Sequence, residues 1–193
     1  MVHLTPEERA SAFKEAFPNY SGFVVHNGAI YGCWIIGAHY YRKNQKFYGA
    51  FPFKLKERIL ALFPDCERVL HLFSGTIQDP NTITYDVDPT YGPTICDDVR
   101  NLLKHKDELR GVDLVIADPP YEERGFMKYG QRPFNKSKVV RELGEILEPG
   151  SCLAWLDVVV PIWSKKVWNL MGVVGVVIST NTRMRVLMLL QKR

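Results

Sequence analysis

Short apolar or β-branched runs alternate with helix-like segments along most of the chain, and this alternation limits the possible folds more than any other feature. The strand-like runs lie at 68–73, 82–88, 112–117 and 152–160. The helix-like segments, whose apolar residues recur at helical spacing, lie at 53–63, 97–105, 136–147 and 163–171. Strands that are apolar on both faces and separated by helices favour a mostly parallel sheet covered on both sides.

Two further strand-like runs, 174–180 and 183–191, end the chain and are joined by about four residues, Thr180 to Arg183. Parallel neighbours need a crossover of about a dozen residues or more, so these two strands must be antiparallel. The sequence therefore predicts an α/β fold whose doubly wound, mostly parallel sheet finishes in an antiparallel C-terminal hairpin.

The N-terminal 45 residues carry separate signals. Thr5, Pro6 and Glu8 form a capping box with proline at the first helical position, which predicts a helix over 5–17. Asn27-Gly28 lies between two β-rich runs and is a strong hairpin signal. Because 193 residues without a linker fit one domain, we expect residues 1–193 to form a single domain, with 1–45 extending a core at 46–193.

The composition excludes several classes of protein. The chain is 46% hydrophobic and 24% charged, as is ordinary for a globular protein, and its longest apolar runs are too short to span a bilayer. Its start has no export signal. The four cysteines form neither a C-x-x-C pair nor a disulfide framework, so we expect a reducing, cytoplasmic location and no metal.

Polar residues follow the predicted strands at the edge where open α/β sheets bind ligands. The first strand runs into Phe73, Ser74, Gly75 and Thr76, and the second ends at Asp86. Further along the chain come Asp97 and Asp98, and then the rigid turn Asp118-Pro119-Pro120-Tyr121. Each of these residues alone could serve only to end or cap a strand. Their order and spacing instead indicate a site.

This order resembles that of the S-adenosylmethionine-dependent DNA methyltransferases that modify exocyclic amino groups, N6 of adenine or N4 of cytosine. Asp118-Pro119-Pro120-Tyr121 matches the D/N/S-P-P-Y/F/W motif of that family. The resemblance covers about residue 46 to the C-terminus and implies a seven-stranded, Rossmann-like methyltransferase sheet. It also implies that Asp118, Pro119, Pro120 and Tyr121 are catalytic and that no metal takes part.

The resemblance further implies S-adenosylmethionine as the cofactor. The residues it assigns to the cofactor are the closing motif Tyr48, Phe51 and Pro52, the loop Phe73, Ser74, Gly75 and Thr76, the ribose-binding Asp86, and an adenine-contacting acid, Asp98 rather than Asp97. The chain departs from the family at one point. The family loop has two glycines, whereas only Gly75 is present here, and this bears on the affinity for the cofactor.

A basic segment after the tetrapeptide is the candidate nucleic-acid contact, with Arg124, Lys128, Arg132 and Lys136; a plain solvated surface is the alternative. The net charge of +4 is weak evidence for an anionic partner. The aspartate of the motif favours adenine, and the motif order favours DNA over RNA as partner. No separate target-recognition domain is visible, so recognition would come from the 122–137 loop, the N-terminal part, or a homodimer or partner subunit. An RNA adenine methyltransferase and a catalytically silent nucleic-acid-binding subunit remain alternatives.

Overall fold

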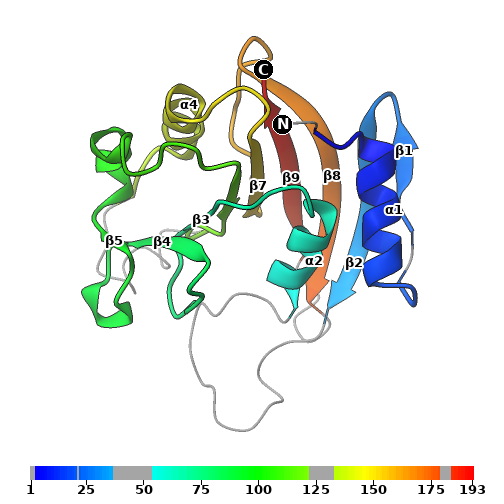
Figure 1. Cartoon of the computed structure of the whole chain (residues 1–193), viewed down its shortest axis with the longest axis horizontal. Helices are drawn as coiled ribbons and strands as arrows, with labels where there is room; N and C mark the ends of the chain where they lie inside the picture. The colour runs from blue at the N-terminus through cyan, green and yellow to red at the C-terminus, as the bar shows by residue number, and fades with distance from the viewer. Residues whose placement is uncertain (1–2, 21, 37–53, 122–132, 179–183) are drawn as a thin grey trace, which may run out of the picture.

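The computed structural model describes residues 3–20, 22–36, 54–121, 133–178 and 184–193. Within these residues, nine strands form one sheet in the order β1-β2-β8-β9-β7-β6-β3-β4-β5 (Figure 1). The strands are β1 (Val24–His26), β2 (Ala29–Ile36), β3 (Val69–Leu72), β4 (Thr82–Asp86), β5 (Ile95–Cys96), β6 (Leu114–Ala117), β7 (Cys152–Asp157), β8 (Trp168–Ile178) and β9 (Met184–Lys192).

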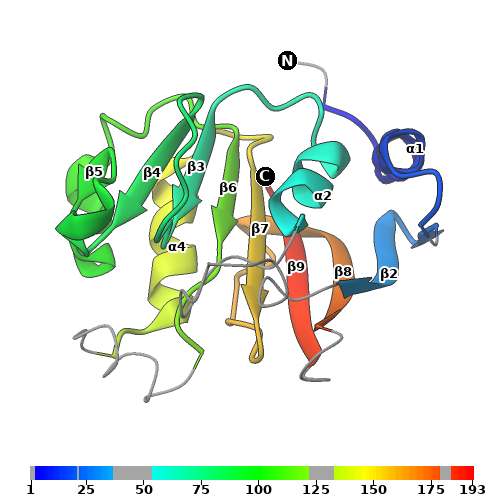
Figure 2. The same ribbon diagram turned by 90° about the horizontal axis from the view of Figure 1, so that it is seen from below.

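Helices cover both faces of this sheet, and each face has its own buried core. The helices are α1 (Pro6–Ala16), α2 (Leu55–Leu62), α4 (Lys136–Ile146) and the 3-10 helices η2 (Pro89–Tyr91) and η3 (Val99–His105). One core contains residues of α1 and α2, and the other contains residues of η3 and α4. Figure 2 shows α2 and α4 on opposite sides of the sheet. None of the described helices is long and apolar enough to cross a bilayer.

The predicted sheet is confirmed in type and corrected in size. β3 pairs in parallel with β4 and β6, and β6 pairs in parallel with β7, whereas β8 and β9 are antiparallel. The expected seven strands become nine because the hairpin β1–β2 joins the sheet through parallel pairing of β2 with β8. Its turn has φ of 48° at Asn27 and 70° at Gly28, the left-handed pair that a two-residue hairpin requires.

The predicted helix over 163–171 is wrong. Residues 165–167 form a turn, and β8 begins at Trp168, which is opposite Lys192 of β9. A short apolar run fits a helix or a strand equally well, and here long-range pairing with β9 decides. The segment predicted as a helix over 97–105 contains the 3-10 helix η3, and the two-residue strand β5 was not predicted.

The connection from β3 to β4 determines the shape of the site. Residues 73–81 contain turns and no helix, although the two strands are parallel neighbours. Such a crossover usually takes about a dozen residues or more and includes a helix. The loop after β3 therefore returns directly to β4.

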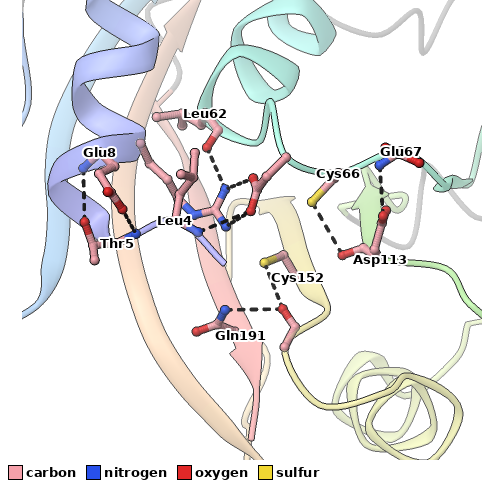
Figure 3. A network of polar contacts seen from close by, with 12 residues as sticks. Leu4, Thr5, Glu8, Leu62, Cys66, Glu67, Asp113, Cys152 and Gln191 are labelled. Carbon is pink, nitrogen blue, oxygen red and sulfur yellow. Dashed lines mark hydrogen bonds and ion pairs between the residues drawn. The ribbon is translucent and has the colours of Figure 1, made fainter. Parts of the chain in front are cut away.

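At the opposite edge of the sheet, buried polar contacts attach α1 to the core. The Arg9 guanidinium is fully buried and donates to both carboxylate oxygens of Asp65, at 2.6 and 2.8 Å, and to the Leu62 carbonyl at 3.0 Å. Figure 3 shows this network beside the capping box of Thr5 and Glu8, which is confirmed. The N-terminal extension is thus packed into the same body as the sheet.

Candidate active site

The carboxyl ends of β3, β4, β6 and β7 lie along one edge because these strands are parallel. This edge brings together the loop that begins at Phe73, Asp86 at the end of β4, the turn that begins at Asp118, and Asp157 at the end of β7. The expectation that polar strand ends converge is confirmed for Phe73, Asp86 and Asp118.

Backbone hydrogen bonds fix the loop after β3. The N–H groups of Phe73 and Ser74 both donate to the Tyr85 carbonyl, at 2.9 and 3.2 Å. The Gly75 N–H donates to Asp86 Oδ2 at 2.8 Å, and the Asp88 N–H donates to Asp86 Oδ1 at 3.0 Å. Asp86, the predicted ribose-binding acid, therefore also shapes the loop, and its half-buried carboxylate keeps lone pairs for further donors.

Phe73 has an unusual backbone conformation for a large side chain, with φ at 62° in the left-handed region. Such a residue costs of order 1–3 kcal/mol and is found mainly where a ligand site needs it. Its ring stacks on Phe134 at 5.4 Å between centroids and meets the Trp155 edge at 6.2 Å. These aromatic contacts support the strained residue, and the role of Phe134 was not predicted from the sequence.

The loop has room and an unused polar group in front of it. The Ser74 hydroxyl is buried and has no hydrogen-bond partner within the described part of the chain. A Cβ added at Gly75, where φ is 52°, would meet none of the described residues within 4 Å. The space therefore lies beside the buried hydroxyl of Ser74 and the carboxylate of Asp86. These groups fit a polar ligand such as the nucleoside part of S-adenosylmethionine.

No helix follows Gly75, so no helix N-terminus points at this space. Dinucleotide sites use such an N-terminus to bind phosphate. The absence of a helix at this point argues against a nucleotide phosphate at this loop. A cofactor without phosphate loses nothing by this absence.

The two acids predicted for the adenine ring already have strong local partners. Asp97 accepts from His105 Nε2 at 2.8 Å and from Asn101 Nδ2 at 2.9 Å, and the His105 contact is the main reason why its pKa falls to about 2. Asp98 caps η3 through the Arg100 N–H at 2.9 Å and also binds the Arg100 guanidinium, which lowers its pKa. Their contact with a cofactor stays a prediction.

The DPPY turn begins directly after β6. Asp118 is half-buried, and desolvation raises the pKa of its carboxyl group to about 6 against the opposing effect of Arg185. The Tyr121 hydroxyl donates a hydrogen bond to Asp118 Oδ1. Pro119 and Pro120 have no N–H, so they add no competing donor beside this carboxylate.

A second carboxylate, Asp157, is fully buried and paired. Its Oδ2 accepts from Lys136 Nζ at 2.7 Å and from Trp155 Nε1 at 3.3 Å, and its Oδ1 accepts from the Val158 N–H at 2.7 Å. These contacts make Asp157 a buried, paired acid at the end of its strand. The Lys136 ammonium, predicted to contact nucleic acid, lies in this ion pair.

Arg185 at the start of β9 completes the site and was missed in the sequence. Its guanidinium carbon lies 4.8 Å from the centre of the Tyr121 ring. β9 runs antiparallel to β7, so its first residues lie beside the last residues of β7. The signal that could have revealed Arg185 was a basic residue at the start of a strand that pairs with the predicted site strand.

Several predicted site residues lie outside the described part of the chain. They are the closing-motif residues Tyr48, Phe51 and Pro52 and the basic residues Arg124, Lys128 and Arg132.

No protein-family model matches the sequence, and no curated protein matches it. Comparison of the fold with solved structures does give matches. TrmN from Thermus thermophilus has a TM-score of 0.53 and 17% identity, over 75% of this chain and 50% of its own. A Streptococcus mutans protein provisionally assigned as an S-adenosylmethionine-dependent methyltransferase has a TM-score of 0.54 and 14% identity, over 95% of this chain and 65% of its own.

SMU.776, provisionally assigned as a methyltransferase and solved in complex with SAH, has a TM-score of 0.51 and 13% identity, over 95% of this chain and 65% of its own. This chain thus spans half the length of TrmN and slightly under two-thirds of the other two proteins. At these identities the likeness concerns the fold, and the chain has the Rossmann-like fold of these methyltransferase structures.

Proposed function

We propose that this protein is an S-adenosylmethionine-dependent methyltransferase that modifies the exocyclic amino group of a nucleic-acid base, adenine N6 in DNA. The observation that carries the proposal is the tetrapeptide Asp118-Pro119-Pro120-Tyr121 at the carboxyl end of a central strand, with the hydroxyl of its tyrosine on its aspartate. The methyltransferase-like fold supports the same conclusion.

The residues that would bind the cofactor are Ser74, Gly75 and Asp86. Among the described residues, nothing bonds to the buried Ser74 hydroxyl and nothing fills the approach at Gly75, and Asp86 offers acceptor oxygens to ribose hydroxyls. When bound, S-adenosylmethionine supplies an electrophilic methyl group on a sulfonium. SAH in the structure of SMU.776, which shares the fold, supports this assignment.

Asp118 has the properties that an acceptor for an amino group needs. The exocyclic nitrogen of adenine is a poor nucleophile because its lone pair is delocalised into the ring. If Asp118 and the Pro119 carbonyl accept its two N–H bonds, the nitrogen is oriented for attack. Positioning by fixed acceptors matters because a misplacement of about 1 Å can cost on the order of a hundredfold in rate.

Tyr121 provides the aromatic surface for the base. A base within a duplex is out of reach of such a site, so it must be flipped out or come from a single strand. Stacking of a base on an aromatic side chain contributes roughly 1–3 kcal/mol. The tetrapeptide therefore combines the acceptor and the stacking surface in one rigid turn.

The test is methyl transfer from isotopically labelled S-adenosylmethionine to DNA and RNA oligonucleotides of the same sequence, single-stranded and duplex, with mass spectrometry of the released nucleosides. We expect labelled N6-methyldeoxyadenosine from the wild-type protein and none from Asp118→Ala, which removes the acceptor. The matched control is Asp107→Ala, which changes an exposed aspartate outside the site. Labelled product in RNA alone would identify RNA, and not DNA, as the substrate. Label in no base would contradict the proposal.

A further inference from the structure

The catalytic tetrapeptide is closed by contacts within the protein itself. The Tyr121 hydroxyl occupies Oδ1 of Asp118, the carboxylate that we assign to the substrate amine. The Arg185 guanidinium lies 4.8 Å from the centre of the Tyr121 ring. Both the acceptor and one face of the stacking surface are thus engaged.

Arg185 is held in place by the backbone of β9. It lies opposite Val176 in the pairing of β8 with β9, so its backbone is fixed within the sheet. Its Nε atom is buried and has no hydrogen-bond partner in the part of the chain that the structure describes. The guanidinium plane can therefore leave the ring without breaking a hydrogen bond at Nε.

The two contacts that compete for the ring are similar in strength. A guanidinium over an aromatic ring contributes about 0.5–2 kcal/mol. A stacked base contributes roughly 1–3 kcal/mol. An incoming base can therefore replace the guanidinium at little net cost, since a planar group already occupies this ring face.

We propose that Arg185 is the gate of the base site: its guanidinium keeps the Tyr121 ring against Asp118 in the absence of substrate and gives way to the base. The identity of the ligand, a nucleobase, rests on the proposed function. Arg185 is in this view a positioning residue whose first effect is on the binding of the base.

Arg185 also belongs to the charges that face Asp118. These are Lys136 at the start of α4, Asp157 at the end of β7, Tyr121 in the turn and Arg185 on β9. Arg185 is the largest of the charge effects that lower the pKa of Asp118. Removing the guanidinium should therefore shift the acid limb of kcat/KM to higher pH, an effect that a purely structural residue would not produce.

The experiment measures binding of an oligonucleotide that contains 2-aminopurine, whose fluorescence changes when the base leaves its stack, at pH 8. In Arg185→Ala we expect the Kd to fall by about three- to tenfold, as the loss of a cation–π contact implies. Arg185→Lys keeps the positive charge but loses the planar group that stacks on the Tyr121 ring. This variant should therefore bind the oligonucleotide more tightly than the wild-type protein, and the acid limb of its kcat/KM profile should stay in place. Arg141→Ala, an exposed arginine of α4, should change neither quantity.

This binding readout does not depend on methyl transfer, so failure of the gate and failure of the proposed function can be told apart. Weaker binding in both Arg185 variants would overturn the gate and make Arg185 a direct contact of the substrate. Equal binding in all four proteins would overturn the gate alone, whereas no binding of the base by any of them would overturn the proposed function together with the gate. Thermal unfolding of each variant checks that it is folded.

Discussion

The carboxyl groups of Asp118 and Asp97 have pKa values that differ widely because their surroundings differ. Burial removes solvent from the Asp118 carboxyl group, and its pKa rises to about 6. Asp97 has a pKa of about 2 because His105 donates to it. Groups whose pKa is moved towards neutrality are frequent in catalysis, whereas strongly paired acids are more often structural. At the scale of single residues, its pKa thus distinguishes Asp118 from Asp97.

This environment predicts a pH dependence of activity. Because the pKa of Asp118 is raised from 3.8 to about 6, its carboxylate is protonated below that pH. The oxygen that carries the proton can then no longer accept a hydrogen bond. We expect log kcat/KM to fall as the pH drops through about 6, with a slope near one. Steady-state rates between pH 4.5 and 8.5 measure this. A flat profile down to pH 4.5 would contradict the assigned role of Asp118.

The elements around the site were predictable to different degrees. Local patterns predicted α1, the Asn27-Gly28 hairpin and the strand that ends at Asp118, because capping, turn and apolar signals all agree there. They failed over 163–171, where pairing between β8 and β9 overrides a helix-like run. They also missed Phe134 and Arg185, since their contacts with Phe73 and Tyr121 depend on which strands and loops become neighbours in space.

The attachment of α1 predicts a large effect on stability. Arg9→Ala leaves Asp65 without its partner and empties a fully buried position, so the free energy of unfolding should fall by about 3–5 kcal/mol. Urea denaturation measures this difference. Glu15→Ala on the exposed face of α1 is the control and should change the free energy by less than about 0.5 kcal/mol. A similar small loss in Arg9→Ala would show that α1 is not anchored through this ion pair.

The 3-10 helix η3 predicts a pH-dependent contribution from His105. Its ring donates to Asp97 and Glu108, and the contact with Asp97 raises its pKa above the ordinary 6.5. The contribution is therefore complete below pH 6.5 and is lost as the pH rises through the raised value. The Asp97 part, with a pKa lowered from 3.8 to about 2, is lost only in strong acid.

The difference in urea midpoint between the wild-type protein and His105→Ala should accordingly be largest near pH 5 and shrink above pH 7. Lys104→Ala, an exposed neighbour, serves as the control. A difference that grows towards high pH would mean that the ring is neutral in the folded protein.

At the scale of the whole molecule, the chain keeps the sheet of a methyltransferase and lacks a helix between β3 and β4. The hairpin β1–β2 extends the sheet at the edge far from β3, and Arg9 attaches α1 to the core. The loop proposed to bind the cofactor is consequently short, with one glycine, a buried Ser74 hydroxyl that has no partner among the described residues, and a carboxylate that binds the loop backbone. The proposed methyltransferase activity therefore depends on whether this reduced loop binds the cofactor.

The most direct measurement is calorimetric titration of the purified protein with S-adenosylmethionine and SAH. We expect micromolar binding by the wild-type protein and by Asp107→Ala, and loss of binding in Asp86→Ala, with thermal unfolding to check that each variant is folded. Absence of binding by the wild-type protein would contradict the proposed methyltransferase activity and leave only the fold.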